Sequence, residues 1–107
     1  MRVERKIRGL KDEITQLCEQ HKLPLPRTVC VMKNYAGRPE KHFVRICVQK
    51  GSEIFDLSIR IQKYVGDELE KIDKFELREY LQKSIRVLCG EEPTLKQEKM
   101  RQMVYLI

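Results

Sequence analysis

The spacing of apolar residues predicts an amphipathic helix at the start of the chain. Between residues 1 and 22, a stripe recurs at alternating intervals of four and three positions, which is typical of one helix face. Pro24 and Pro26 follow, and proline ends a helix because it lacks a backbone donor. The stripe consists of Val3, Ile7, Leu10, Ile14, Leu17 and His21.

This stripe has two interpretations. It packs on the domain's own sheet, or it pairs with a partner helix, because it is as narrow as a coiled-coil seam. Gly9 interrupts the pattern and weakens the helix by up to ~1 kcal/mol relative to alanine. In the second interpretation Val3, Ile7 and Leu10 contact a protein partner.

The middle of the chain predicts three strands joined by tight turns. We expect strands over residues 28–33, 42–49 and 54–62, which are rich in β-branched and apolar side chains. Turn-forming residues such as Gly37 and Gly51 separate them. Apolar and polar positions alternate in the last two strands, so the three-stranded meander should have one dry face and one wet face.

The last third of the chain predicts a second helix over residues 67–89 and a C-terminal appendage over residues 94–107. The helix start is ambiguous, because two positions, Asp67 and Asp73, are each followed by a glutamate at capping-box spacing. Gly90 suits the left-handed residue that follows a helix end. Residues 94–102 favour a short helix, and residues 103–107 form either an edge strand, which we favour, or a docking tail.

Together these elements predict an α+β fold of the order αβββα. Both helices need an apolar surface and the sheet offers one, so two helices should cover one face of a three-stranded antiparallel sheet. A short extra helix or strand would follow at the C-terminus. The length of 107 residues fits a single domain over residues 1–107.

The hydropathy pattern also bears on location. No apolar run approaches the roughly 20 residues of a membrane span. No secretory signal follows Met1. We therefore expect no membrane partner, and a location in the cytoplasm, with the nucleus as the alternative.

The net charge of +6 is unevenly distributed and points to nucleic acid. Residues 23–66 carry eight basic and three acidic groups, whereas residues 67–92 carry five basic and eight acidic groups. Basic groups on the wet sheet face, the first hairpin and the N-terminal helix would neutralise phosphates. An aromatic ring in the same loop would stack on a base. The predicted RNA-binding residues are Lys33, Tyr35, Arg38, Lys41, Arg45, Arg60, Arg2, Arg5, Lys6 and Arg8.

No catalytic motif stands out. The chain has no glycine-rich phosphate loop, no G-x-S-x-G motif and no histidine pair at metal-binding spacing, so we expect no enzymatic activity and no cofactor. Its cysteines form no C-x-x-C pair and are interpreted as reduced, packed thiols. Zinc is the alternative, with two scattered groupings: Cys18 with His21, and Cys30 and Cys47 with His42.

The order of elements resembles three kinds of αβββα module. These are double-stranded RNA-binding domains, the small proteins of the signal recognition particle Alu domain, and RWD-type interaction domains. Residues 33–38 and 72–75 are similar to segments of the Alu-domain proteins. Residues 71–88 lack the lysine- and alanine-rich start with which double-stranded RNA-binding domains grip phosphates. The likeness bears on the fold more than on the function.

Two functional hypotheses follow. The first is a small non-catalytic RNA-binding or ribonucleoprotein-associated protein that contacts the backbone of structured RNA, for example ribosomal RNA. The second is a protein-interaction module or homodimer that uses the N-terminal stripe and an apolar C-terminal segment. In that segment Met103, Tyr105 and Ile107 are the expected contacts, because a free β-prone segment can extend a partner's sheet.

Overall fold

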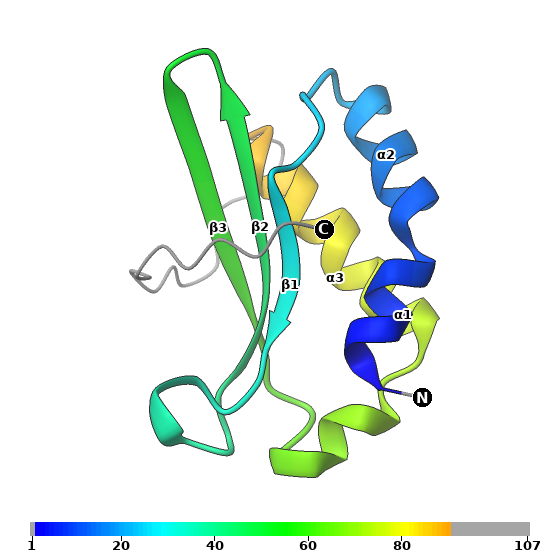
Figure 1. Cartoon of the computed structure of the whole chain (residues 1–107), viewed down its shortest axis with the longest axis vertical. Helices are drawn as coiled ribbons and strands as arrows, with labels where there is room; N and C mark the ends of the chain where they lie inside the picture. The colour runs from blue at the N-terminus through cyan, green and yellow to red at the C-terminus, as the bar shows by residue number, and fades with distance from the viewer. Residues whose placement is uncertain (1, 91–107) are drawn as a thin grey trace.

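The computed structural model describes residues 2–90 of the chain. The predicted appendage at residues 94–107 lies outside them. Figure 1 shows the arrangement of the helices and strands. Their order is α1 (Val3–Gly9), α2 (Lys11–Gln20), β1 (Thr28–Met32), the 3-10 turn η1 (Tyr35–Gly37), β2 (His42–Lys50), β3 (Glu53–Ile61), the 3-10 helix η2 (Gly66–Lys71) and α3 (Lys74–Leu88).

The three strands form the predicted antiparallel meander in the order β1-β2-β3. A tight turn joins β2 to β3, and Gly51 in this turn has a positive φ of 62°. The register between β1 and β2 starts at Thr28 opposite Cys47, so the last residues of β2 have no neighbour in β1. The β2–β3 hairpin therefore extends beyond the rest of the sheet (Figure 1).

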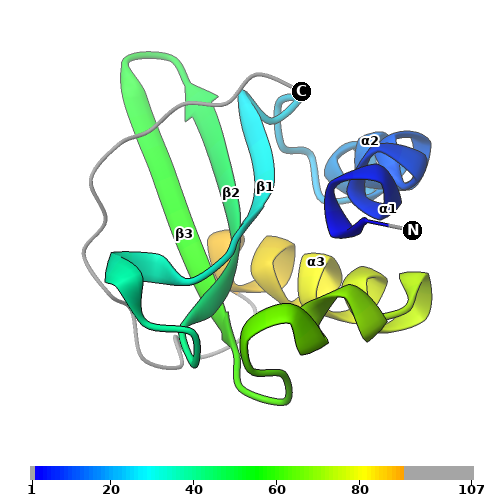
Figure 2. The same cartoon turned by 60° about the horizontal axis from the view of Figure 1, so that its bottom comes forward.

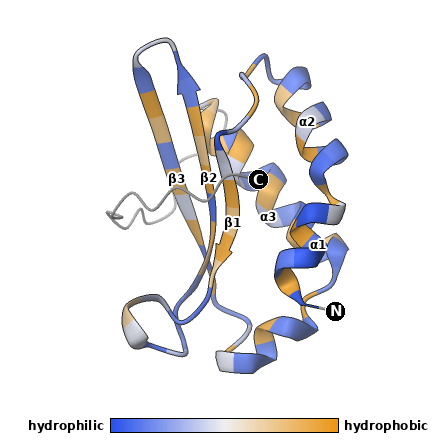
Figure 3. Ribbon diagram, in the orientation of Figure 1, coloured by the Kyte–Doolittle hydropathy of each residue, from blue (hydrophilic) through white to orange (hydrophobic). Residues whose placement is uncertain are grey.

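The helices cover one face of this sheet, which confirms the two-layer α+β fold (Figures 1 and 2). Hydrophobic and hydrophilic segments alternate along β3 in Figure 3, as the period of two requires. The covered face and the facing helix residues form one core. Its most deeply buried members include Val44, Ile46, Ile61, Leu69, Ile72, Leu77 and Ile85.

The predicted helix over residues 1–22 is instead two helices with a break at Leu10. The backbone of Leu10 has φ −96° and ψ 6°, and its N–H donates to the carbonyl of Ile7 at 3.0 Å, three residues back. Gly9 precedes the break, and glycine is a poor helix former. The break lets α1 pack on β1 and α3 while α2 runs along α3.

The second predicted helix begins later than residue 67. Residues 66–71 form η2, and the extended backbone of Ile72 separates it from α3. Asp73 caps α3, because its carboxylate accepts a hydrogen bond from the N–H of Glu76 at 2.9 Å. The second of the two predicted caps is thus the true helix start, and Gly90 follows the helix end with a φ of 74°. No helix in residues 2–90 is long and apolar enough to cross a membrane.

Candidate nucleic-acid interface

Three arginines form an exposed stripe on α1. Arg2 is the N-cap residue, and Arg5 and Arg8 follow within the helix at three-residue spacing, so the three lie on one side of α1, away from buried Val3 and Ile7. All three are exposed, and none forms an ion pair with another residue of the described chain. This arginine stripe provides three cations that remain available to an external anion.

The fourth predicted cation of α1 has a structural role. Lys6 donates hydrogen bonds from its ammonium group to the carbonyl oxygens of Glu70 and Ile72, at 2.7 and 2.5 Å. These carbonyls lie at the end of η2, where backbone acceptors lack helical partners. Lys6 therefore links α1 to the end of η2, and its ammonium group is used in this internal contact.

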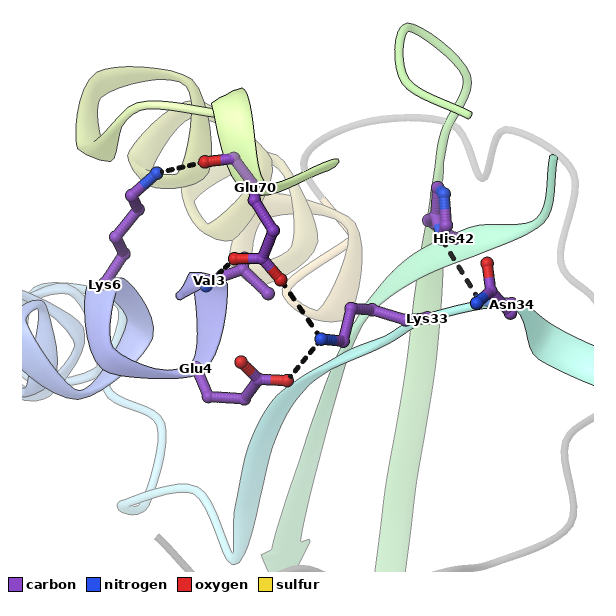
Figure 4. A network of polar contacts seen from close by, with 7 residues as sticks. All are labelled: Val3, Glu4, Lys6, Lys33, Asn34, His42 and Glu70. Carbon is purple, nitrogen blue, oxygen red and sulfur yellow. Dashed lines mark hydrogen bonds and ion pairs between the residues drawn. The ribbon is translucent and has the colours of Figure 1, made fainter. Parts of the chain in front are cut away.

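Glu70 connects three elements of this end of the molecule (Figure 4). Its carboxylate accepts a hydrogen bond from the N–H of Val3 at 2.7 Å, in the first turn of α1. The other carboxylate oxygen accepts from the ammonium group of Lys33 at 3.1 Å, in the loop after β1. Glu70 thus acts as a cap supplied from outside α1, whose own N-cap residue makes no side-chain cap hydrogen bond.

The charge of Lys33 is largely neutralised within the protein. Its ammonium group also forms an ion pair with Glu4 at 3.0 Å. Hydrogen bonds to Glu4 and then Glu70 raise the pKa of Lys33. Partial burial pushes the pKa of Glu4 up, but its backbone and Lys33 hydrogen bonds lower it overall. Lys33 therefore fixes the loop and is a weaker candidate for phosphate contact than sequence alone indicated.

The β1–β2 loop takes a compact shape that turns Arg38 toward solvent. Asn34, Ala36 and Gly37 all have positive φ angles, of 52°, 57° and 73°. The N–H of Tyr35 donates to the carbonyl of Lys41 at 2.8 Å and closes the loop. Arg38 is exposed and Lys41 is half-buried.

Tyr35, the predicted stacking residue, already contacts a second ring. The centroids of Tyr35 and Phe43 lie 5.6 Å apart in an edge-to-face arrangement of 83°. Phe43 itself is buried, although it shares a sheet face with Arg60, its partner in the register between β2 and β3. Tyr35 is half-buried, so it keeps part of its surface for a ligand.

His42 anchors the loop, and sequence analysis did not identify this role. Its Nδ1 accepts the N–H of Asn34 at 3.2 Å, and the side chain is fully buried (Figure 4). The other ring nitrogen has no hydrogen-bond partner in the structure. Burial, and then the charge of Lys33, lowers the pKa of His42, so the neutral ring that can accept this bond is favoured.

The expectation of a bare cationic sheet face is corrected by the burial of Arg45. Arg45 and Arg60 share the face that α1, α2 and α3 do not cover, as predicted. However, Arg45 is only 1% exposed and its guanidinium binds the carboxylate of Asp56 through two hydrogen bonds. The hydrogen bonds that Arg45 donates to the Asp56 carboxylate raise the pKa of Arg45. The guanidinium serves this internal ion pair and is not presented to solvent.

Arg60 is the other arginine of this face, and it is half-buried. It lies opposite Phe43 in the register between β2 and β3. Its Nε is buried and has no hydrogen-bond partner in the structure. Of the two predicted arginines on this face, Arg60 is the one with remaining exposed surface.

The prediction that Val3, Ile7 and Leu10 of the N-terminal stripe contact a protein partner is wrong. Val3, Ile7 and Leu10 are at most 3% exposed and belong to the protein's own core. The other predicted partner residues, Met103, Tyr105 and Ile107, lie outside the described residues. The interpretation of the stripe as packing on the domain's own sheet is confirmed.

No protein-family model matches the chain, and neither a curated protein nor a solved structure shows significant similarity to it. The cysteines of residues 2–90 form no disulfide bonds. In that same part of the chain, no three histidine, cysteine, aspartate or glutamate side chains gather as they would around a metal ion.

Proposed function

We propose that this protein is a small non-catalytic RNA-binding protein that contacts the phosphate backbone of structured RNA. The observation that carries the proposal is the exposed arginine stripe on α1, located at the same end of the molecule as the β1–β2 loop with Arg38 (Figures 1 and 2). Arginine suits this role because its planar guanidinium binds phosphate oxygens in pairs and keeps its charge at any physiological pH.

The internal ion pairs support this assignment by separating structural from available cations. Lys6 and Lys33 hold α1, η2 and the loop together through Glu70, and Arg45 is paired inside the fold. This network keeps the arginine stripe and Arg38 in a fixed spatial relationship. Preorganised cations lose less conformational entropy on binding than cations on a flexible tail.

Such a surface reads shape more than sequence, because contacts to phosphate carry no direct base information. The partly exposed ring of Tyr35 adds a contact for one unstacked base of a loop or bulge. A ribonucleoprotein subunit in the cytoplasm, with the nucleus as the alternative, fits this description.

A salt titration against a structured RNA hairpin tests the proposal. Binding should weaken steeply with salt, and the triple variant Arg2→Gln, Arg5→Gln and Arg8→Gln should reduce the slope of log K against log salt by about 2 to 3. The matched control removes three lysines elsewhere, with Lys22, Lys50 and Lys83 changed to glutamine. Absence of binding at low salt, or equal loss in both variants, would refute the proposal.

A further inference from the structure

A second surface lies at the opposite end of the molecule from the arginine stripe. There α2 ends at Gln20, α3 ends at Leu88, and the β2–β3 hairpin continues past β1 (Figure 1). The helices therefore stop short of the hairpin tip and leave a cavity of about 270 Å³ between these elements.

The floor of this cavity is apolar. It is formed by Leu23, Val48 and Leu88 together with Phe55. Phe55 lies opposite Val48 in the register of the hairpin, on the sheet face that the helices cover elsewhere. It is nevertheless 39% exposed, although the alternation of β3 predicts a core position. An aromatic side chain on the core face with no complete cover is a typical anchor point for a partner.

The rim of the cavity is basic. Lys22 and Lys50 line it, both are exposed, and neither forms an ion pair within the described part of the chain. Lys22 follows the C-cap residue of α2 and has a left-handed backbone with a φ of 56°. Two cations beside an apolar floor complement a ligand that carries carboxylates next to one apolar group.

We infer that this pocket binds a short acidic segment of a partner protein, which inserts one apolar side chain between Phe55, Leu23 and Leu88 and presents carboxylates to Lys22 and Lys50. Leu23 and Leu88, which line the pocket beside Phe55, are aliphatic, so a nucleic-acid base would have Phe55 alone to stack upon. The cavity volume of about 270 Å³ fits one side chain better than a whole nucleotide. The pocket is separate from the proposed RNA surface, and a ribonucleoprotein subunit would use both.

The test uses the full chain with labelled methyl groups and the peptide acetyl-Asp-Phe-Glu-amide as the probe. We expect saturable shifts of the Leu23, Val48 and Leu88 methyl signals with a Kd on the order of 1 mM, as befits a small ligand. Changing Lys22 and Lys50 to glutamate should weaken this peptide by about tenfold and favour acetyl-Lys-Phe-Lys-amide instead. The same change at Lys11 and Lys83, which lie outside the pocket, should leave binding unchanged.

Three outcomes would overturn the inference. The first is a lack of saturable methyl shifts in the folded protein. The second is equal binding of the acidic and the basic peptide. The third is an oligouridylate that shifts the same methyl signals at lower concentration than the acidic peptide, which would make nucleic acid the occupant. None of these readouts depends on the arginine stripe, so failure of this inference can be distinguished from failure of the proposed function.

Discussion

Replacing Glu70 tests how the proposed RNA surface is held together. The Glu70→Ala variant removes the hydrogen bond to the N–H of Val3 and the ion pair with Lys33. A charged cap bond of this kind contributes about 1.5 kcal/mol. The ion pair, with both side chains about a third exposed and Glu4 as a remaining partner, contributes about 0.5 kcal/mol. The free energy of unfolding should therefore fall by about 2 kcal/mol.

Urea denaturation measures this loss, and a melting experiment should show a decrease in Tm of roughly 10 °C for a domain of this size. Glu70→Gln keeps an acceptor for Val3 and should lose about half as much. Glu68→Ala is the matched control, because Glu68 pairs only with Lys71 within the same short helix and both side chains are well exposed. Its effect should stay within about 0.5 kcal/mol.

Equal stability of Glu70→Ala and Glu68→Ala would contradict this role of Glu70. Unchanged hydrogen exchange in the first turn of α1 in Glu70→Ala would contradict it too, because the cap bond to Val3 would then not protect that turn. In the predicted case, RNA affinity should decline together with this local protection, since Arg2 and Arg5 of the arginine stripe lie at the first turn of α1.

Three further predictions concern the core, the loop and α3. Asp56→Asn removes the carboxylate charge that pairs with the buried guanidinium of Arg45 and should destabilise the fold by about 3 kcal/mol in urea, whereas Asp67→Asn on exposed η2 should have little effect. Folding lowers the pKa of His42 below its ordinary value of 6.5. The contribution of the neutral ring to the free energy of unfolding should therefore be complete above pH 6.5 and should be lost as the pH falls through the folded pKa. His42→Gln should flatten this decline between pH 7 and pH 5, and an unaltered urea midpoint profile would argue against the role of the ring. Asp73→Ala removes the cap of α3 and should lower the free energy of unfolding by about 1 kcal/mol. Asp73→Ser keeps a capping oxygen and should restore most of this loss. Equal melting curves of the two variants by circular dichroism would contradict the cap assignment.

Sequence periodicity was sufficient to predict the layers of the fold, because it reports directly which side of an element is apolar. It predicted the meander and the buried helix stripes, whereas capping-box spacing left Asp67 and Asp73 as alternative caps, of which the structure shows Asp73. It did not predict the break at Leu10, since Gly9 signals only a weakened helix and the geometry of the break depends on packing against β1 and α3.

The candidate site was less predictable because its contacts are distant in sequence. Glu70 lies 67 residues from Val3, so no local pattern identifies it as the cap of α1. Alternation along β2 separated the two sheet faces correctly but treated every polar position as exposed, so the burial of Arg45 was missed. The exposure of Phe55 was missed for the converse reason, because it depends on where α2 and α3 end relative to the hairpin.

Amide chemical-shift mapping of the full chain with a structured RNA hairpin locates the RNA-binding surface. The perturbed amides should cluster at Arg2, Arg5 and Arg8 and in the β1–β2 loop around Arg38, and the amides beside Arg45 should remain unchanged. Perturbations that centre on the strand around Arg45 and spare α1 would contradict the proposed function.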